Sequence, residues 1–141
     1  TLRRAVEYGL PMGEWPTGSE IAAGVAGALA AGDDVWAVRL LCDGVNRLRY
    51  ARAAGRLDQA LLPPPSTGSI EWDTLIAASV VFKLKNLSVH PPPAWTDVPR
   101  LITDWTPVYV NAEKAARDRA GTPPELARVG IYWHERNYNT A

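Results

Sequence analysis

The chain has 141 residues, with 15 basic and 15 acidic side chains and therefore no net charge at pH 7. This length supports one domain that can bury roughly two-thirds of its unfolded surface. Zero net charge argues against a strongly electrostatic partner such as a nucleic-acid duplex. The single cysteine, Cys42, excludes a disulfide within the chain and favours a reducing compartment, so we expect a cytoplasmic protein.

No apolar run approaches the roughly 18 residues that a membrane helix needs, so we expect no membrane segment. A neutral chain resists self-association weakly, which leaves a homo-oligomer open. Because the chain starts at Thr1 and not at Met, we expect the natural protein to have further sequence before it.

The first elements in the chain are predicted to be helices. A short helix is expected over residues 1–10. A second helix is predicted over residues 19–31, because the Ser19 hydroxyl can accept a free amide of its first turn. Gly24 and Gly27 each cost about 1 kcal/mol relative to Ala in a helix. Their presence indicates that a neighbouring helix approaches closely.

The longest helix is predicted over residues 33–54, with Asp33 or Asp34 as its cap. Its apolar residues recur at steps of three and four, which places them on one face. This face contains Val35, Val38, Leu41, Cys42, Val45 and Leu48. Much of the other side is basic and contains Arg39, Arg47, Arg49 and Arg52. Residues 57–62 are expected to add one more helical turn.

Residues 63–68 form the clearest boundary, because their three prolines supply no amide donors and a Ser/Thr/Gly run follows. They separate an N-terminal helical half, residues 1–62, from a C-terminal helical half, residues 69–141. We expect the two halves to pack as one domain. Ser69 is predicted to cap a helix that has two acidic residues in its first turn.

The segment from Pro91 to Trp105 contains four prolines and two tryptophans. We interpret it as a stiff corner that begins in an extended conformation and is anchored by Trp95 and Trp105, since an exposed indole forfeits roughly 2–3 kcal/mol of burial. A helix is predicted to start at residue 96 or 97, with Pro99 in its first turn. The alternative is a proline-rich ligand that another protein module binds.

Two further helices are predicted in the C-terminal part, the first over residues 108–120. In the second, Thr122 is the expected cap, Pro123 the first helical residue and Glu125 the returning carboxylate of a capping box. Residues 131–138 are predicted to form a short strand or an extended tail on the core. The sequence therefore predicts an all-α fold with about six helices and a short extended segment at its C-terminal end.

The sequence contains no recognisable catalytic or metal-binding set. His134 and Glu135 begin a zinc-protease motif, but Tyr138 occupies the position of its second histidine. His90 is the only other histidine, and two histidines with one cysteine make a poor metal shell. We therefore expect no metal, no cofactor and no catalytic residues. A small enzyme with a site assembled from dispersed Asp, Glu, Arg and His side chains is the remaining alternative.

The six tryptophans and five tyrosines suit a contact surface, because each combines a large apolar body with a hydrogen-bonding group. The predicted protein-partner surface consists of Trp95, Trp105, Tyr132, Trp133, Arg136 and Tyr138. The alternative function is a DNA-binding transcriptional regulator that uses Arg39, Arg47, Arg49 and Arg52. It is not favoured, because Asp33 and Asp34 would meet phosphate oxygens at the leading end of the recognition helix.

Four motifs in residues 69–141 carry a family resemblance: "EWDTLIAA" (71–78), "PPAWT" (92–96), Trp105, and "TPPELARVGIYWHERNY" (122–138). This half resembles the C-terminal region of actinobacterial antitoxin-like proteins and helix-turn-helix regulators. The genes beside those proteins frequently encode toxins of the abortive-infection nucleotidyltransferase type. Because this chain lacks a helix pair suited to DNA, the resemblance implies a non-enzymatic module that binds and occludes a cognate toxin.

Overall fold

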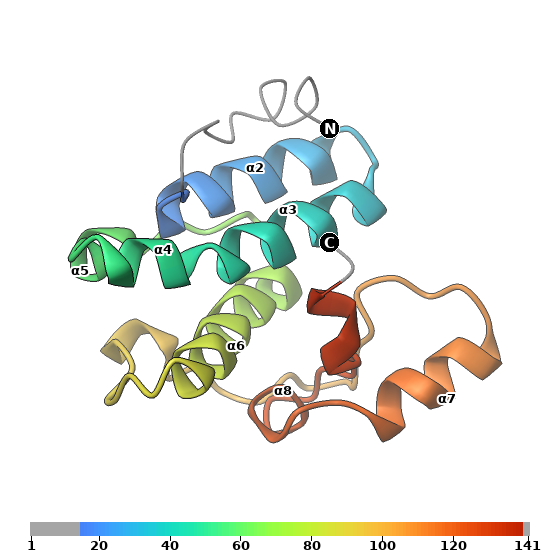
Figure 1. Ribbon diagram of the computed structural model, residues 1–141. Helices are drawn as coiled ribbons and strands as arrows, with labels where there is room; N and C mark the ends of the chain where they lie inside the picture. The colour runs from blue at the N-terminus through green and yellow to red at the C-terminus, as the bar shows by residue number, and fades with distance from the viewer. Residues whose placement is uncertain (1–14, 140–141) are drawn as a thin grey trace.

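Helices α2 (Gly18–Ala30) and α3 (Asp34–Asn46) lie side by side, and the long helix α6 (Ile70–Asn86) crosses beneath them (Figure 1). The structure is a computed structural model that describes residues 15–139, so the helix predicted over residues 1–10 lies outside the described part. The other helices are α4 (Leu48–Ala53), α5 (Leu57–Ala60), α7 (Ala112–Ala120) and α8 (Pro124–Ala127), with 3-10 helices η1 (Ala94–Thr96) and η2 (Glu135–Tyr138).

The all-α class is confirmed. Within residues 15–139 the extended backbone forms one isolated parallel bridge, between Trp105 and Ile131, and no sheet. No helix in this range is long and apolar enough to cross a membrane. A single hydrophobic core contains residues of both halves, from Ile21 on α2 to Tyr138 on η2.

Helix α2 begins with a capping box at Thr17 and not at Ser19. The Thr17 hydroxyl accepts the Glu20 amide at 3.2 Å, and the Glu20 carboxylate accepts the Thr17 amide at 3.0 Å. The prediction of Ser19 was wrong because the pair three residues apart satisfies two free amides, whereas a lone serine satisfies one. The Asp33 cap of α3 is confirmed, since its carboxylate accepts the Trp36 amide at 3.0 Å.

The helix predicted over residues 33–54 is divided at Arg47 into α3 and α4. Arg47 has φ −79° and ψ −6°, which ends the regular helix for one residue. Leu48 and Ala51 of α4 nevertheless remain in the core. The chain then leaves α4 through Gly55, whose φ of +71° suits glycine. Helix α5 supplies the additional turn predicted after it.

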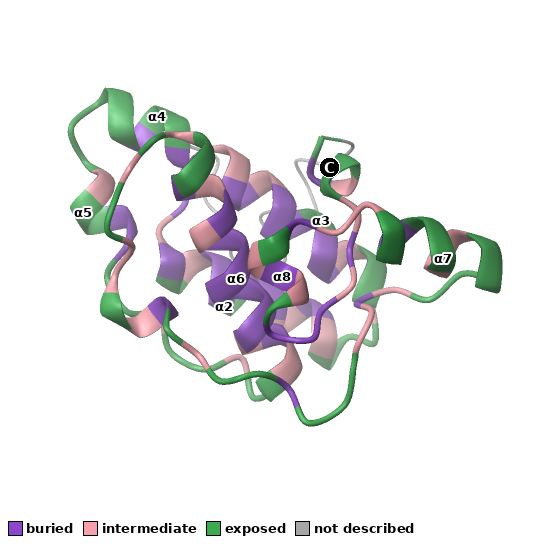
Figure 2. Cartoon of the chain, turned by 90° about the horizontal axis from the view of Figure 1, so that it is seen from below, coloured by how far each residue is buried: buried purple, intermediate pink, exposed green. Residues whose placement is uncertain are grey.

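Helix α6 is the central element, and most of its residues are buried (Figure 2). Ser69 caps it as predicted, with its hydroxyl accepting the Trp72 amide at 3.4 Å. Helix α6 contacts α2, α3, α8 and η1. Side chains on several of its faces are therefore buried, including Ala77, Phe82 and Leu84.

The helix predicted from residue 96 or 97 is absent, and η1 ends at Thr96. Residues 97–111 instead run as extended chain and turns. The Leu101 amide donates to the Val129 carbonyl and the Trp105 amide to the Gly130 carbonyl, each at 2.9 Å. Pairing with a distant segment thus satisfies donors that a local helix would have used. Helix α7 begins at Ala112 and not at residue 108, because the Asn111 side chain caps it by accepting the Lys114 amide at 2.8 Å.

Thr122 is not the cap of α8, because its hydroxyl serves a tertiary contact. It donates to the Asp118 carbonyl at 2.5 Å and accepts the Trp133 amide at 2.9 Å. The N-cap of α8 is Pro123, one residue later than predicted. After α8, Gly130 turns the chain with φ +87°, residues 131–133 run extended over the core, and η2 follows.

Candidate functional site

Two of the six predicted contact residues are core residues. Trp133 is 5% exposed and Tyr138 is 2% exposed. The Tyr138 hydroxyl forms a 2.6 Å hydrogen bond with the Ser79 hydroxyl, and its ring lies 5.2 Å from that of Phe82. Burial raises the pKa of Tyr138 well above its usual value, so the phenol stays neutral. In this conformation neither side chain presents a surface to a partner.

Trp95 and Trp105 are half-buried and anchor their segment as expected of a stiff corner. The Trp95 indole N–H donates to the Leu61 carbonyl at 2.8 Å, which ties the proline segment to the N-terminal half. The Trp105 ring meets the Trp72 ring edge to face, with centroids 5.4 Å apart. Both indoles therefore have a structural role, whatever further contact their exposed parts make.

Tyr132 and Arg136 complete the predicted set and lie nearer the surface. The Arg119 guanidinium lies 4.0 Å from the centre of the half-buried Tyr132 ring. Arg136 is exposed on η2. The six residues are thus divided among the core, a corner and two surface positions, and they do not form one continuous contact surface.

The four arginines of the alternative DNA-binding interpretation are engaged within the protein or separated. Arg47 pairs with Asp43 at 3.3 Å, and Arg52 donates to the Leu87 carbonyl. Arg49 stacks on the Tyr50 ring at 4.8 Å. Arg47 and Arg49 line an open depression of about 760 Å³, whereas Arg39 lines a different cavity.

That second cavity, about 290 Å³ in volume, is lined mainly by apolar side chains. We call it the α3–α7 groove. Its rim consists of Val35, Val38 and Arg39 from α3, Val108 and Val110 from the segment before α7, and Lys114 from α7. The floor includes the buried Cys42 and Trp133.

Large apolar side chains beside this groove face water. Val35 is 49% exposed, Tyr109 68% and Val110 60%. Val35 was predicted to lie on the buried face of its helix, so its exposure is a correction. The sequence signal that could have revealed this site is the apolar triplet Val108–Tyr109–Val110 directly before the Asn111 cap. It was assigned instead to the start of a helix.

The floor of the groove is chemically inert. Burial raises the pKa of the Cys42 thiol to about 12, and the neighbouring Trp133 indole opposes this shift only in part. The thiol is therefore protonated at neutral pH and a poor nucleophile. Cys42 contributes apolar surface to the groove and no reactivity.

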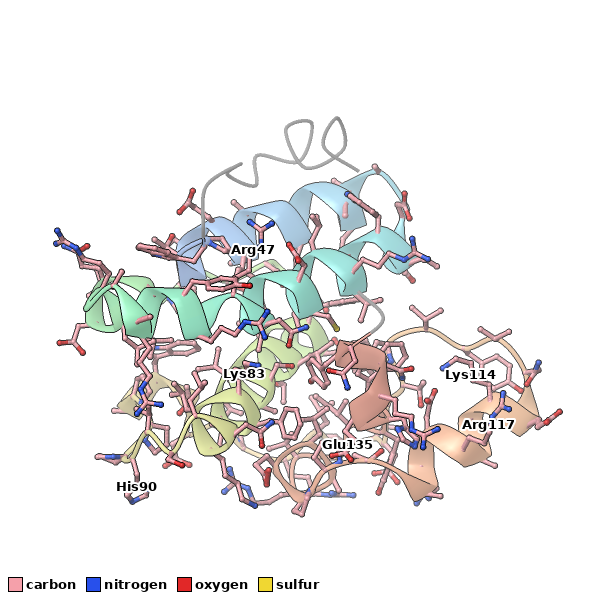
Figure 3. All side chains as sticks on the ribbon, in the orientation of Figure 1. Arg47, Lys83, His90, Lys114, Arg117 and Glu135 are labelled. Atoms are coloured by element: carbon pink, nitrogen blue, oxygen red, sulfur yellow. The ribbon has the colours of Figure 1, made fainter. Side chains whose placement is uncertain are left out.

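A further cleft of about 360 Å³ lies between α3, α6 and η2, and its lining includes Lys83 and Glu135, both labelled in Figure 3. Burial, followed by repulsion from Arg49, lowers the pKa of Lys83. The cleft offers no paired carboxylates or activated nucleophile for the small-enzyme alternative. In the part of the chain that the structure describes, no three His, Cys, Asp or Glu side chains are grouped to hold a metal ion.

Comparison of the chain with family models, with curated proteins and with solved structures finds no match. The resemblance of residues 69–141 to antitoxin-like proteins accordingly stays a prediction.

Proposed function

We propose that this chain is a protein-binding module and that its partner-binding surface is the α3–α7 groove. The observation that carries the proposal is that Val35 and Val110, both exposed, line one apolar cavity, with the exposed Tyr109 next to Val110 in the chain. Each of these side chains exposes apolar area to water. Burying that area against a partner would stabilise the complex by about 25 cal/mol per Å². Apolar side chains gathered around a hollow are typical of a contact site, whereas scattered ones are ordinary.

The charges at the rim support a partner segment that is apolar and also acidic. Arg39 is exposed and forms no ion pair with another residue of the range 15–139. Lys114 lies on the opposite rim, where Asp118 already holds its ammonium group at 2.9 Å. Arg39 is thus the rim cation available to a partner carboxylate, and such a pair orients binding more than it strengthens it.

The antitoxin-like form of this proposal takes a cognate toxin as the partner, as the family resemblance implies. An amphipathic helix or loop of that toxin would place its apolar face in the groove and an acidic residue beside Arg39. In this version the predicted aromatic residues act indirectly, because Trp133 forms the floor on which the partner would rest. Binding and occlusion need no catalytic group from this chain.

The direct test is co-purification of the chain with the product of the neighbouring gene, followed by titration of the purified pair. Val35→Asp and Val110→Asp should each weaken the complex by about tenfold or more, because each puts a charge into an apolar contact. Leu62→Asp is the matched control, since Leu62 is also a large exposed apolar residue but does not line the groove. It should bind as the unmodified chain does.

Two results would count against the proposal in different ways. Absence of any complex at micromolar concentration would refute the toxin as partner. If all three substitutions weakened the complex equally, or if none of them weakened it, the groove would be refuted as the partner-binding surface. A parallel titration with the DNA upstream of the gene tests the alternative, because phosphate contacts through Arg47 and Arg49 must weaken steeply with salt.

A further inference from the structure

A cavity separate from the α3–α7 groove, of about 470 Å³, lies on the other side of α7, between this helix and η2. We call it the α7–η2 pocket. Several of the side chains that line it are basic: Lys114 and Arg117 from α7, and His134 and Arg136 from the segment that starts η2. Figure 3 labels Lys114 and Arg117 along α7 and Glu135 on the neighbouring 3-10 helix.

The single carboxylate in the lining is already neutralised. The side chain of Asp118 is 3% exposed and accepts the Lys114 ammonium group at 2.9 and 3.1 Å. It also accepts the Asn137 amide at 3.0 Å. The charges of Asp118 and Lys114 therefore balance, and the two guanidinium groups leave the pocket with an excess of positive charge.

These two guanidinium groups are available to a ligand. Arg117 has only a long contact with Glu113, 3.8 Å, between two well-exposed side chains, and such surface pairs contribute little. Arg136 is exposed and makes no ion pair within the described residues 15–139. Arginine presents a planar fork of donors that fits the oxygens of a phosphate group.

His134 supplies a further donor in a fixed orientation. Its Nδ1 accepts the Arg136 amide at 3.0 Å, so the neutral ring carries its proton on Nε2. The ring lies directly over Gly121, where a Cβ atom would be 2.1 Å from Nε2 and Cδ2. Gly121 has φ −106°, which any residue adopts, so glycine is needed here for space and not for backbone freedom.

We propose that the α7–η2 pocket binds a small phosphate-bearing ligand, with the phosphate group held by Arg117, Arg136 and His134. Donors from two separate elements line the hollow, and the oxygens of a tetrahedral anion point in different directions and can accept from both. Two guanidinium groups match the charge of a phosphate dianion, since Arg136 has no ion-pair partner within residues 15–139 and Arg117 has only the 3.8 Å contact with Glu113. The volume lies within the range of pockets for small molecules and leaves room for more than the phosphate itself. This inference does not rest on partner binding in the α3–α7 groove.

The test is a titration of the full chain with sodium pyrophosphate at constant ionic strength. Binding is monitored by calorimetry and by the ¹⁵N–¹H spectrum. We expect saturable binding, with the largest shifts at the amides of Gly121 and Arg136. Arg117→Gln and Arg136→Gln should each weaken binding by about tenfold, as the loss of one charged hydrogen bond does. Arg128→Gln is the matched control, because Arg128 is an exposed arginine outside the pocket.

Gly121→Ala should also weaken binding, because the new methyl group displaces the imidazole. Since Gly121→Ala can lose binding simply because it misfolds, the two arginine variants decide the test. Their thermal unfolding is compared with that of the unmodified chain to show that they are folded. Shifts that stay linear with concentration, or that centre on Arg47 and Arg49, would overturn the proposal. So would malonate binding as tightly as pyrophosphate, because a carboxylate site would then explain the result.

Discussion

The hydroxyl groups of Tyr138 and Ser79 lie 2.6 Å apart inside the core and join η2 to the middle of α6. The same residue is tied to α3 through its carbonyl, which accepts the Asn46 side-chain amide at 2.5 Å. Tyr138 thus holds the end of the described chain against two helices of the core. The position of Trp133 under the α3–α7 groove depends on the same segment.

Tyr138→Phe is expected to lower the free energy of unfolding by about 1–2 kcal/mol, because it leaves the buried Ser79 hydroxyl without its partner. Ser79→Ala should cost a similar amount. The double variant should cost less than the sum, because neither partner is then left unsatisfied. Urea unfolding measures all three. Tyr109→Phe, on an exposed tyrosine, serves as the control and should leave stability within about 0.5 kcal/mol.

Stability is expected to fall above about pH 9, because the folded state holds the Cys42 and Tyr138 protons more tightly than the unfolded chain does. The pKa of Cys42 rises from 9.0 to about 12 on folding, and the pKa of Tyr138 also rises. A group whose pKa is raised by folding contributes its full stabilisation below the pKa that it has in the unfolded chain. That stabilisation is lost as the pH rises toward the pKa that the group has in the folded protein. Each group contributes about 1.4 kcal/mol per pH unit inside its window.

Lys83 has the opposite effect on stability. Its pKa is lowered on folding, so its contribution to the free energy of unfolding becomes more favourable as the pH rises. Urea unfolding between pH 7 and pH 11 measures the net slope. Cys42→Ala should make the fall shallower between pH 9 and 11, because it removes one of the two groups that cause it. A slope that is unchanged by this substitution would show that the thiol is not the group that titrates.

Gly44→Ala should destabilise the contact between α2 and α3. A Cβ atom at this position would lie 2.7 Å from Ile21 Cγ1 and 2.8 Å from its Cδ1, inside a closely packed core. We expect a loss of about 1–3 kcal/mol from overpacking, in spite of the better helix propensity of Ala. In an Ile21→Ala background the same change should be neutral or stabilising, and thermal unfolding of the four variants tests this.

Asp118→Asn should loosen α7, because this helix is fixed largely through one carboxylate. Asp118 is the buried residue of α7, which otherwise projects from the body of the protein (Figure 1). Loss of the ion pair with Lys114 should cost about 2–3 kcal/mol and speed amide exchange in α7. Glu113→Gln removes an exposed pair on the same helix and should change stability by less than about 0.5 kcal/mol.

Equal effects of the two changes in α7 would contradict this account, because they would imply that burial of the carboxylate does not matter. Amide exchange confined to residues 112–120 would distinguish release of the helix from general destabilisation. The comparison also bears on the α3–α7 groove, since Lys114 lies on its rim.

The candidate sites were less predictable than the fold. Aromatic density pointed to the C-terminal segment, but it could not tell a buried indole such as Trp133 from one that meets a partner. The groove depends on Val35 and Val110, which lie far apart in the chain and line one cavity only because the segment before α7 lies beside α3. The α7–η2 pocket likewise depends on Gly121 meeting His134.

The sequence alone determined the all-α class and the caps at Asp33 and Ser69. These features follow from the spacing of apolar residues and from hydrogen bonds between residues a few positions apart. Tertiary structure alone decided that residues 97–111 stay extended and that Trp133 and Tyr138 are buried. The physical reason is that the partners of these groups, the Val129 and Gly130 carbonyls and the Ser79 hydroxyl, come from distant parts of the chain.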